Sequence, residues 1–93
     1  MFVEVKPNSF ESIVITWMYE NFPDLYADPV IGGVDFWTKD CFLVHVSPTM
    51  HVIKYNLSEL CSFKRIDANI ADPTYFVTLK ELITSQLKRM RIR

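Results

Sequence analysis

The sequence predicts a single α+β domain spanning residues 1–93, with an antiparallel sheet and two amphipathic helices packed on one face. Its 93 residues make about one domain's worth of chain. Two segments repeat apolar residues at helical spacing, and shorter apolar runs between them are separated by turn-forming residues. The expected element order is β-α-β-β-β-(β)-α. An antiparallel sheet with both helices on one face would bury both helical stripes and leave the other face partly open.

Residues 2–6 alternate apolar and charged side chains, which predicts a strand with one solvent-facing side. A helix is expected next, because Asn8 and Glu11 have the spacing of a capping box. Apolar residues then recur at helical intervals. That stripe comprises Phe10, Ile13, Val14, Trp17, Met18 and Phe22. Pro23 disfavours helical geometry at Phe22 and ends the helix there.

The stretch 23–33 contains both glycines of the chain, two prolines and two aspartates, which predicts a loop. Three apolar runs follow, with turn-forming residues at 39–40 and 47–49 between them. The runs are Val34–Thr38, Cys41–Val46 and Met50–Tyr55. This pattern favours an antiparallel meander.

Residues 56–71 allow two interpretations. Asn56 and Glu59 have capping-box spacing and could begin a short helix. Alternatively, a turn at 56–59 leads into a fourth meander strand over Leu60–Ile66, and this is the interpretation we favour.

The last segment predicts a second helix that runs to about residue 90. Asp72 can cap its start, and Pro73 suits the first helical position. Its apolar stripe consists of Phe76, Leu79, Ile83, Leu87 and Met90.

Composition excludes several classes of protein. The apolar fraction is 49%, and only seven residues are Gly or Pro, so the chain is neither disordered nor low in complexity. No uncharged stretch reaches the roughly 18–20 apolar residues of a membrane span. The N-terminus has no secretory signal pattern, and the two cysteines are too few for a disulfide scaffold. We expect a cytoplasmic protein without a membrane partner.

Charge is distributed unevenly along the chain, although the net charge is only −1. Residues 1–40 contain seven acids and two bases, which gives −5. Residues 41–93 contain eight bases and four acids, which gives +4. Such asymmetry is typical of an interaction surface.

Two cysteines and two histidines raise the hypothesis of a zinc site; they are Cys41, His45, His51 and Cys61. The set lacks the close cysteine pair typical of zinc sites. A two-residue turn at Pro48-Thr49 would set His45 opposite Val52 and His51 opposite Val46, so the histidines would point to opposite faces. A three-residue loop would instead bring the histidines together. We expect no metal site.

No serine-hydrolase, zinc-protease or nucleotide-binding motif occurs in the chain. The acids at 24, 28, 35 and 40 could form a carboxylate pair, but loop aspartates more often cap turns. We therefore expect neither enzymatic activity nor a cofactor.

Nucleic-acid binding is the alternative function, because basic residues gather on the outer side and at the end of the last helix. These residues are Lys80, Lys88, Arg89, Arg91 and Arg93. The α-β-β-β-α order after the first strand resembles the layout of the double-stranded-RNA-binding domain. That family has a basic run at the start of its final helix, whereas residues 72–76 here are acidic and aromatic.

Protein binding is the function that the sequence favours. Thirteen aromatic residues exceed what two helices and one sheet face must bury, and large exposed aromatics anchor interfaces. The expected contact residues are Tyr26, Asp28, Asp35, Phe36 and Trp37. We expect an adaptor, regulator or inhibitor of another protein, in a format that suits a phage or viral accessory protein, with a homodimer as a further form.

Overall fold

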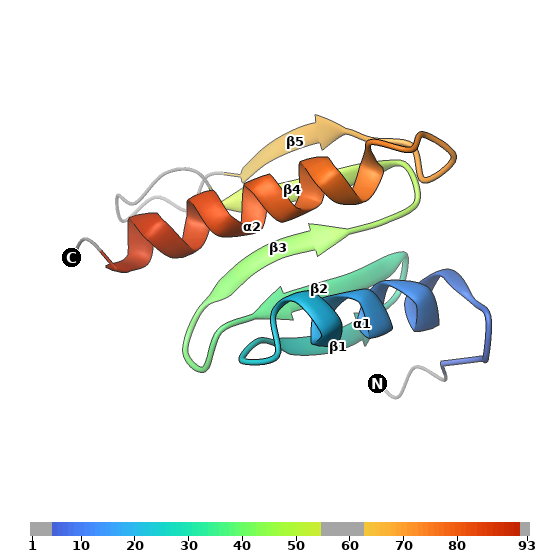
Figure 1. Cartoon of the computed structure of the whole chain (residues 1–93), viewed down its shortest axis with the longest axis horizontal. Helices are drawn as coiled ribbons and strands as arrows, with labels where there is room; N and C mark the ends of the chain where they lie inside the picture. Colours follow the sequence, from blue (N-terminus) through green and yellow to red (C-terminus); the bar gives the residue numbers. More distant parts are fainter. Residues whose placement is uncertain (1–4, 55–62, 92–93) are drawn as a thin grey trace.

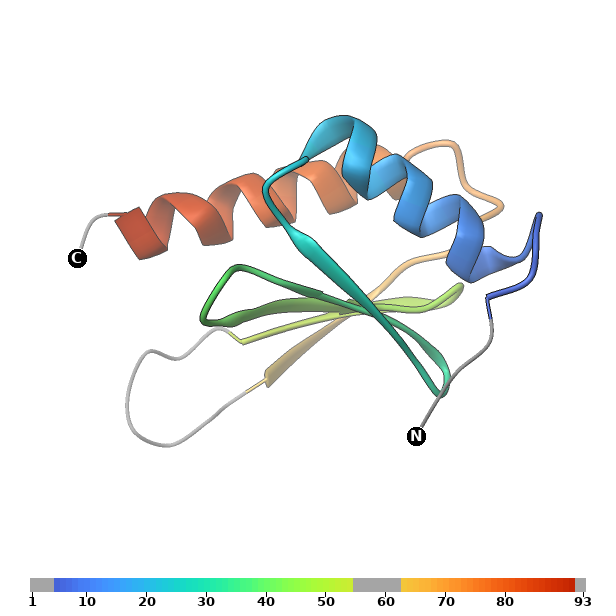
Figure 2. The ribbon, with the colours of Figure 1, turned by 90° about the horizontal axis from the view of Figure 1, so that it is seen from below.

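Both helices lie on the same face of one antiparallel sheet in the computed structural model, which describes residues 5–54 and 63–91 (Figures 1 and 2). The elements are α1 (Phe10–Asn21), β1 (Tyr26–Val30), β2 (Gly33–Trp37), β3 (Phe42–Val46), β4 (Met50–Lys54), β5 (Phe63–Asp67) and α2 (Tyr75–Arg91). The strands follow one another across the sheet in chain order. The predicted α+β class, antiparallel sheet and two helices are confirmed.

Helix α1 begins one residue later than the capping box predicted. Ser9 is its N-cap, and the Ser9 hydroxyl accepts a hydrogen bond from the amide of Ser12. Asn8 instead takes a left-handed backbone conformation with φ of 63°, which asparagine tolerates better than most residues. The helix ends before Phe22, as Pro23 predicted.

The prediction of a loop over residues 23–33 is wrong, because β1 occupies the middle of that stretch. Strand β1 forms a hairpin with β2 in which Val30 pairs with Gly33. It is an edge strand, so Pro29 removes no hydrogen bond from the interior of the sheet. Gly32 takes a φ of 90° in the turn, which a residue with a side chain adopts only with strain.

The predicted meander over the middle of the chain is confirmed in β2, β3 and β4. A further strand, β5, confirms the strand interpretation over residues 63–66, whereas residues 60–62 and the turn or short helix predicted at 56–59 lie outside the described residues. The strand predicted over residues 2–6 falls mostly outside the described residues, and Val5 and Lys6 do not belong to a strand.

The core lies between the sheet and the helices. Alternation along β2, β3 and β4 points one set of side chains toward the helices, where they meet the apolar stripes of α1 and α2. Its fully buried members include Val14, Met18, Val34, Phe36, Val44, Val46, Leu79 and Ile83. Ile13, predicted in the α1 stripe, is instead about half exposed.

Helix α2 is attached to the strands by two side-chain hydrogen bonds. The Tyr75 hydroxyl donates to the backbone carbonyl of Ser47, and the Gln86 amide donates to that of Lys54 at 2.8 Å. The helix starts two residues after Pro73, because Asp72 accepts hydrogen bonds from the Thr74 amide and hydroxyl in a preceding turn. These two hydrogen bonds lower the pKa of the Asp72 carboxyl.

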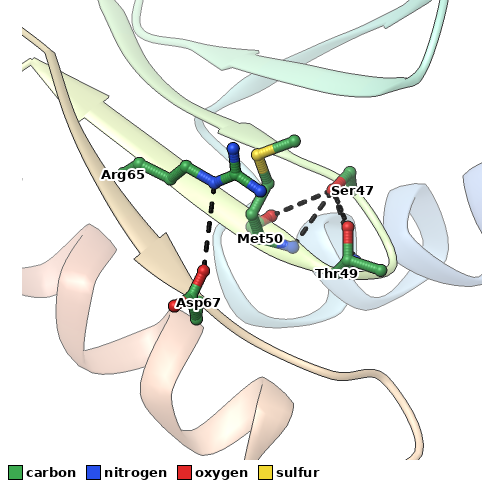
Figure 3. Close-up of polar contacts among 5 residues, drawn as sticks. All are labelled: Ser47, Thr49, Met50, Arg65 and Asp67. Atoms are coloured by element: carbon green, nitrogen blue, oxygen red, sulfur yellow. Dashed lines mark hydrogen bonds and ion pairs between the residues drawn. The ribbon is translucent and has the colours of Figure 1, made fainter.

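The turn between β3 and β4 sets the register of the two strands. The Ser47 amide donates to the Met50 carbonyl at 2.9 Å, and the Ser47 hydroxyl accepts from the Met50 amide at 3.1 Å. The hydroxyls of Ser47 and Thr49 also meet, as Figure 3 shows. The result is the two-residue turn, with His45 opposite Val52.

Candidate functional site

The candidate site is the open face of the sheet, which we define as the face opposite the two helices (Figure 2). Five residues, one from each strand, form a row across it. They pair in register from β1 to β5 and are Asp28, Asp35, His45, Val52 and Arg65. We call this set the charged row. Its members share a face because directly paired residues of adjacent strands point to the same side.

Four aromatic residues form a second set on the open face, which we call the aromatic row: Tyr26, Trp37, Phe42 and Phe63. Tyr26 pairs with Trp37, and Trp37 pairs with Phe42. The Trp37 and Phe42 rings meet edge-on with centroids 5.6 Å apart, and Phe42 meets Phe63 in the same manner at 6.0 Å. Tyr26 and Phe63 are 57% and 55% exposed, so large apolar surface faces solvent.

A β-bulge brings Phe42 into the aromatic row. The register between β2 and β3 shifts between Phe36 and Trp37, so that Trp37 pairs with Phe42 while Phe36 pairs with Val44. Leu43 is the additional residue, and its side chain is buried. The bulge thus lets Leu43 join the core while Phe42 remains beside Trp37 on the open face.

A shallow groove of about 510 Å³ runs between the two rows. Its lining consists of Asp35, Trp37, Phe42, His45, Val52, Lys54 and Phe63. These residues come from four adjacent strands, so the rigid sheet fixes their relative positions. The lining combines apolar and aromatic side chains with charged ones, a combination suited to contact with a protein surface.

Asp35 and His45 form a shorter polar contact on the open face than Arg65 and Asp67 do. The His45 Nδ1 atom lies 2.7 Å from Asp35 Oδ1, and both side chains are 23% exposed. With Nδ1 protonated, the imidazole donates a hydrogen bond to the carboxylate. The pair holds both side chains in one orientation at the centre of the charged row.

Charge changes sign across the open face. The β1 and β2 members of the charged row, Asp28 and Asp35, are acidic, whereas β4 and β5 contribute Lys54 and Arg65. Arg65 lies 3.9 Å from Asp67 on its own strand, and both are largely exposed (Figure 3). Because exposed pairs of this length bind weakly, Arg65 is available to a partner.

The structure places four of the five predicted protein-contact residues on the open face: Tyr26, Asp28, Asp35 and Trp37. Phe36 is a correction, because its side chain points toward the helices and is fully buried. Strand alternation explains the difference. Adjacent residues of a strand point to opposite faces, so Phe36 and Trp37 cannot both face solvent.

Sequence reasoning missed Phe42 and Phe63 as members of this surface. Phe63 shares a face with Trp37 only through three intervening strand pairings, and Phe42 reaches its place through the bulge. Along β2, the alternation of side chains between the two faces correctly indicates which residues share a face with Trp37. No signal in the sequence indicates the bulge.

The two histidines of the zinc hypothesis do not come together. His45 pairs with Val52 and His51 pairs with Val46, so the two histidines point to opposite faces of the sheet. Cys41 is exposed, and Cys61 lies outside the described residues. Within the described ranges, no group of three or more His, Cys, Asp or Glu side chains is arranged to hold a metal ion.

His51 is a buried residue of the core rather than a ligand. Its ring is fully buried and meets the Tyr75 ring edge-on, with centroids 4.7 Å apart. Neither ring nitrogen has a hydrogen-bond partner in the part of the chain that the structure describes. Burial lowers the pKa of His51 and raises the pKa of Tyr75, so both stay neutral at neutral pH.

Four of the five basic residues of the nucleic-acid alternative belong to α2, which lies on the face of the sheet opposite the open face. Lys80, Lys88 and Arg89 are exposed there, and Glu81 lies beside Lys80 on the same outer surface. Arg91 ends the helix, and Arg93 lies outside the described residues. The described sheet has five strands between the two helices, whereas the layout of the double-stranded-RNA-binding domain has three.

A smaller depression of about 310 Å³ lies where β5 leads into α2. Its polar lining includes Asn69 and Asp72, whose amide and carboxyl oxygens already accept hydrogen bonds from Ala71 and Thr74. These contacts close local turns and leave the depression without a group directed at a ligand.

Neither helix of the described part of the chain is long and apolar enough to cross a membrane. No protein-family model, curated protein or solved structure matches this chain.

Proposed function

We propose that this protein is a protein-binding module that recognises its partner with the open face of the sheet. The observation that carries the proposal is the aromatic row, which exposes Tyr26, Trp37 and Phe63 on a rigid sheet beside a groove. A module of this kind acts as an adaptor, regulator or inhibitor of the protein that it binds.

The exposed aromatic surface supports binding on energetic grounds. A few interface residues usually contribute most of the binding free energy. Trp and Tyr are enriched among these residues, because their large rings are removed from water when the complex forms. Packing between Trp37, Phe42 and Phe63 limits their rotamers before binding, so less conformational entropy is lost. The charged row then provides polar contacts that select one orientation of the partner.

The charges of the open face favour a protein over a nucleic acid. Asp28, Asp35 and Asp67 lie on this face and would repel phosphates, which outweighs the attraction of Lys54 and Arg65. Lys88, Arg89 and Arg91 lie in the last turn of α2, where the helix dipole stabilises cations, and Lys80 lies beside Glu81. The open face is therefore the surface that we assign to binding.

Capture from a native extract with two matched tyrosine variants tests the proposal. Tyr26 on the open face and Tyr19 on α1 are 57% and 50% exposed, so Tyr26→Ala and Tyr19→Ala remove the same side chain from opposite sides of the protein. Quantitative mass spectrometry of captured proteins should show a partner retained by wild type and Tyr19→Ala and at least about tenfold depleted with Tyr26→Ala. Equal recovery with Tyr26→Ala would refute the assignment.

A further inference from the structure

We propose that a second copy of this chain also covers the open face, in a dimer whose two-fold axis runs parallel to the strands. The inference rests on the open face being an interaction surface, as proposed above, and adds an occupant of defined geometry. Its basis is that the charged row is complementary to itself under this rotation, whereas the other symmetric arrangement sets like charges against each other.

The charged row selects the axis. When two sheets pack face to face, a two-fold axis between them runs either along the strands or across them. An axis that runs across the strands along the charged row places β1 over β1, so that Asp28 meets Asp28 of the second copy. An axis along the strands places β1 over β5, so that Asp28 meets Arg65 of the second copy, and this occurs twice by symmetry. Charge complementarity favours the second arrangement.

The aromatic row is complementary under the same rotation. Position along the strand is kept while the strand order is reversed, so Tyr26 lies over Phe63 of the second copy. Trp37 lies over Lys54 of the second copy, in position for a cation–π contact. Phe42, on the central strand, meets its own equivalent near the axis.

The size of the sheet determines how strongly such a dimer associates. Five strands of five residues, about 4.8 Å apart with a rise of about 3.3 Å per residue, span roughly 24 by 17 Å. The flat area is roughly 400 Å² on each copy, a small footprint for an interface, since a standard interface buries about 800 Å² of accessible surface per partner. The dimer is therefore weak and concentration-dependent, and a protein partner displaces the second copy from the same face.

Two charge reversals test the geometry in the full chain. Asp28→Lys sets two lysines against the Arg65 side chains of the dimer, and Arg65→Glu sets two glutamates against the Asp28 side chains. For each variant alone, the dissociation constant of the dimer should be at least about tenfold higher than for wild type. Sedimentation-velocity experiments over a concentration series measure this constant. An equimolar mixture of the two should associate again, because the introduced lysine of one copy then meets the introduced glutamate of the other, and the remaining Arg65 meets the remaining Asp28.

The controls separate folding from association. Circular dichroism should show both variants folded, and Lys80→Glu, a reversal on the outer surface of α2, should leave the dissociation constant unchanged. The proposal is overturned if wild type stays monomeric at millimolar concentration, or if the mixture fails to associate. Association of Asp28→Lys with wild type more strongly than of wild type with itself would indicate the other axis and also overturn it.

The dimer and the protein partner fail independently. A monomeric wild type with partner capture that depends on Tyr26 and not on Tyr19 rejects the dimer and supports the proposed function. A dimer that obeys the charge reversals, with capture indifferent to Tyr26→Ala, supports the dimer and rejects recognition of another protein by this face.

Discussion

Gly33 allows β2 and β3 to approach each other closely. A methyl group at this position would lie 2.0 Å from the carbonyl oxygen of Val46, which is backbone and cannot move aside. Gly33→Ala should therefore lower the free energy of unfolding by about 1–3 kcal/mol or more in urea titrations. Gly32→Ala is the control, because no atom of a neighbouring part of the described structure lies within 4 Å of an added methyl group there. Only the φ of 90° is strained with a side chain, so we expect the free energy of unfolding to fall by about 1 kcal/mol. Equal losses would contradict this role of Gly33.

His51 makes stability depend on pH in a defined direction. Because burial lowers its pKa below the 6.5 of the unfolded chain, the unfolded state binds a proton that the folded state does not. As far as His51 determines it, the free energy of unfolding is thus highest above pH 6.5 and decreases as pH falls from 6.5 toward the lowered pKa.

Replacing His51 by leucine removes this pH dependence and so measures it. His51→Leu removes two buried nitrogens without partners among the described residues, so we expect the free energy of unfolding at pH 7 to rise by about 1–3 kcal/mol. The gain should increase as pH falls from 6.5 to 5, since wild type alone loses stability through this residue. Denaturant titrations at both pH values measure it. A gain that is constant or shrinks toward pH 5 would contradict the burial account.

Tyr75 connects helix α2 to the β3–β4 turn at the scale of elements. Its hydroxyl donates the hydrogen bond to the Ser47 carbonyl in a buried setting. Tyr75→Phe should cost about 1–2 kcal/mol of unfolding free energy, because the carbonyl loses its partner away from water. Tyr19→Phe, at an exposed position of α1, should cost nothing measurable by thermal denaturation. An unchanged melting temperature for Tyr75→Phe would argue against this link.

The adjacent residues Phe36 and Trp37 separate the two faces of β2. Phe36 fills the core, so Phe36→Ala should cost about 3–5 kcal/mol of unfolding free energy. Trp37 is 37% exposed on the open face, so Trp37→Ala should cost much less stability and instead reduce binding. Chemical denaturation together with partner capture distinguishes the two variants. The reverse order of stabilities would contradict the assignment of faces.

Elements were predictable where the pattern was regular. Turn residues at 39–40 and 47–49 separate β2, β3 and β4, and helical spacing identified α1 and α2. Strand β1 was missed because proline and aspartate, here Pro29 and Asp28, are typical of loops. Both are compatible with a strand here because β1 lies at the edge of the sheet. Edge position is a property of the assembled sheet, so local composition does not reveal it.

At the scale of the whole molecule, the order of strands converts charge along the chain into charge across a surface. Strands β1 and β2 come from the segment of charge −5, and β4 and β5 from the segment of charge +4. Because the meander keeps chain order, Asp28 and Asp35 lie on the β1–β2 side of the open face, and Lys54 and Arg65 lie on the β4–β5 side together with Asp67. The sequence contained this asymmetry, and four of its five candidate contacts lie on the open face. Phe42, Phe63 and the burial of Phe36 required the strand register and the bulge.

The most direct test of the open face as the binding surface is site-specific photo-cross-linking in a native extract. The photoreactive amino acid p-benzoylphenylalanine replaces Phe63 on the open face or Val77 on α2, which are 55% and 58% exposed. Cross-linked species are then identified by mass. We predict adducts with a protein partner, or with a second copy of the chain, from position 63 and none from position 77. Adducts from position 77 alone, or equal yields from both, would contradict the account.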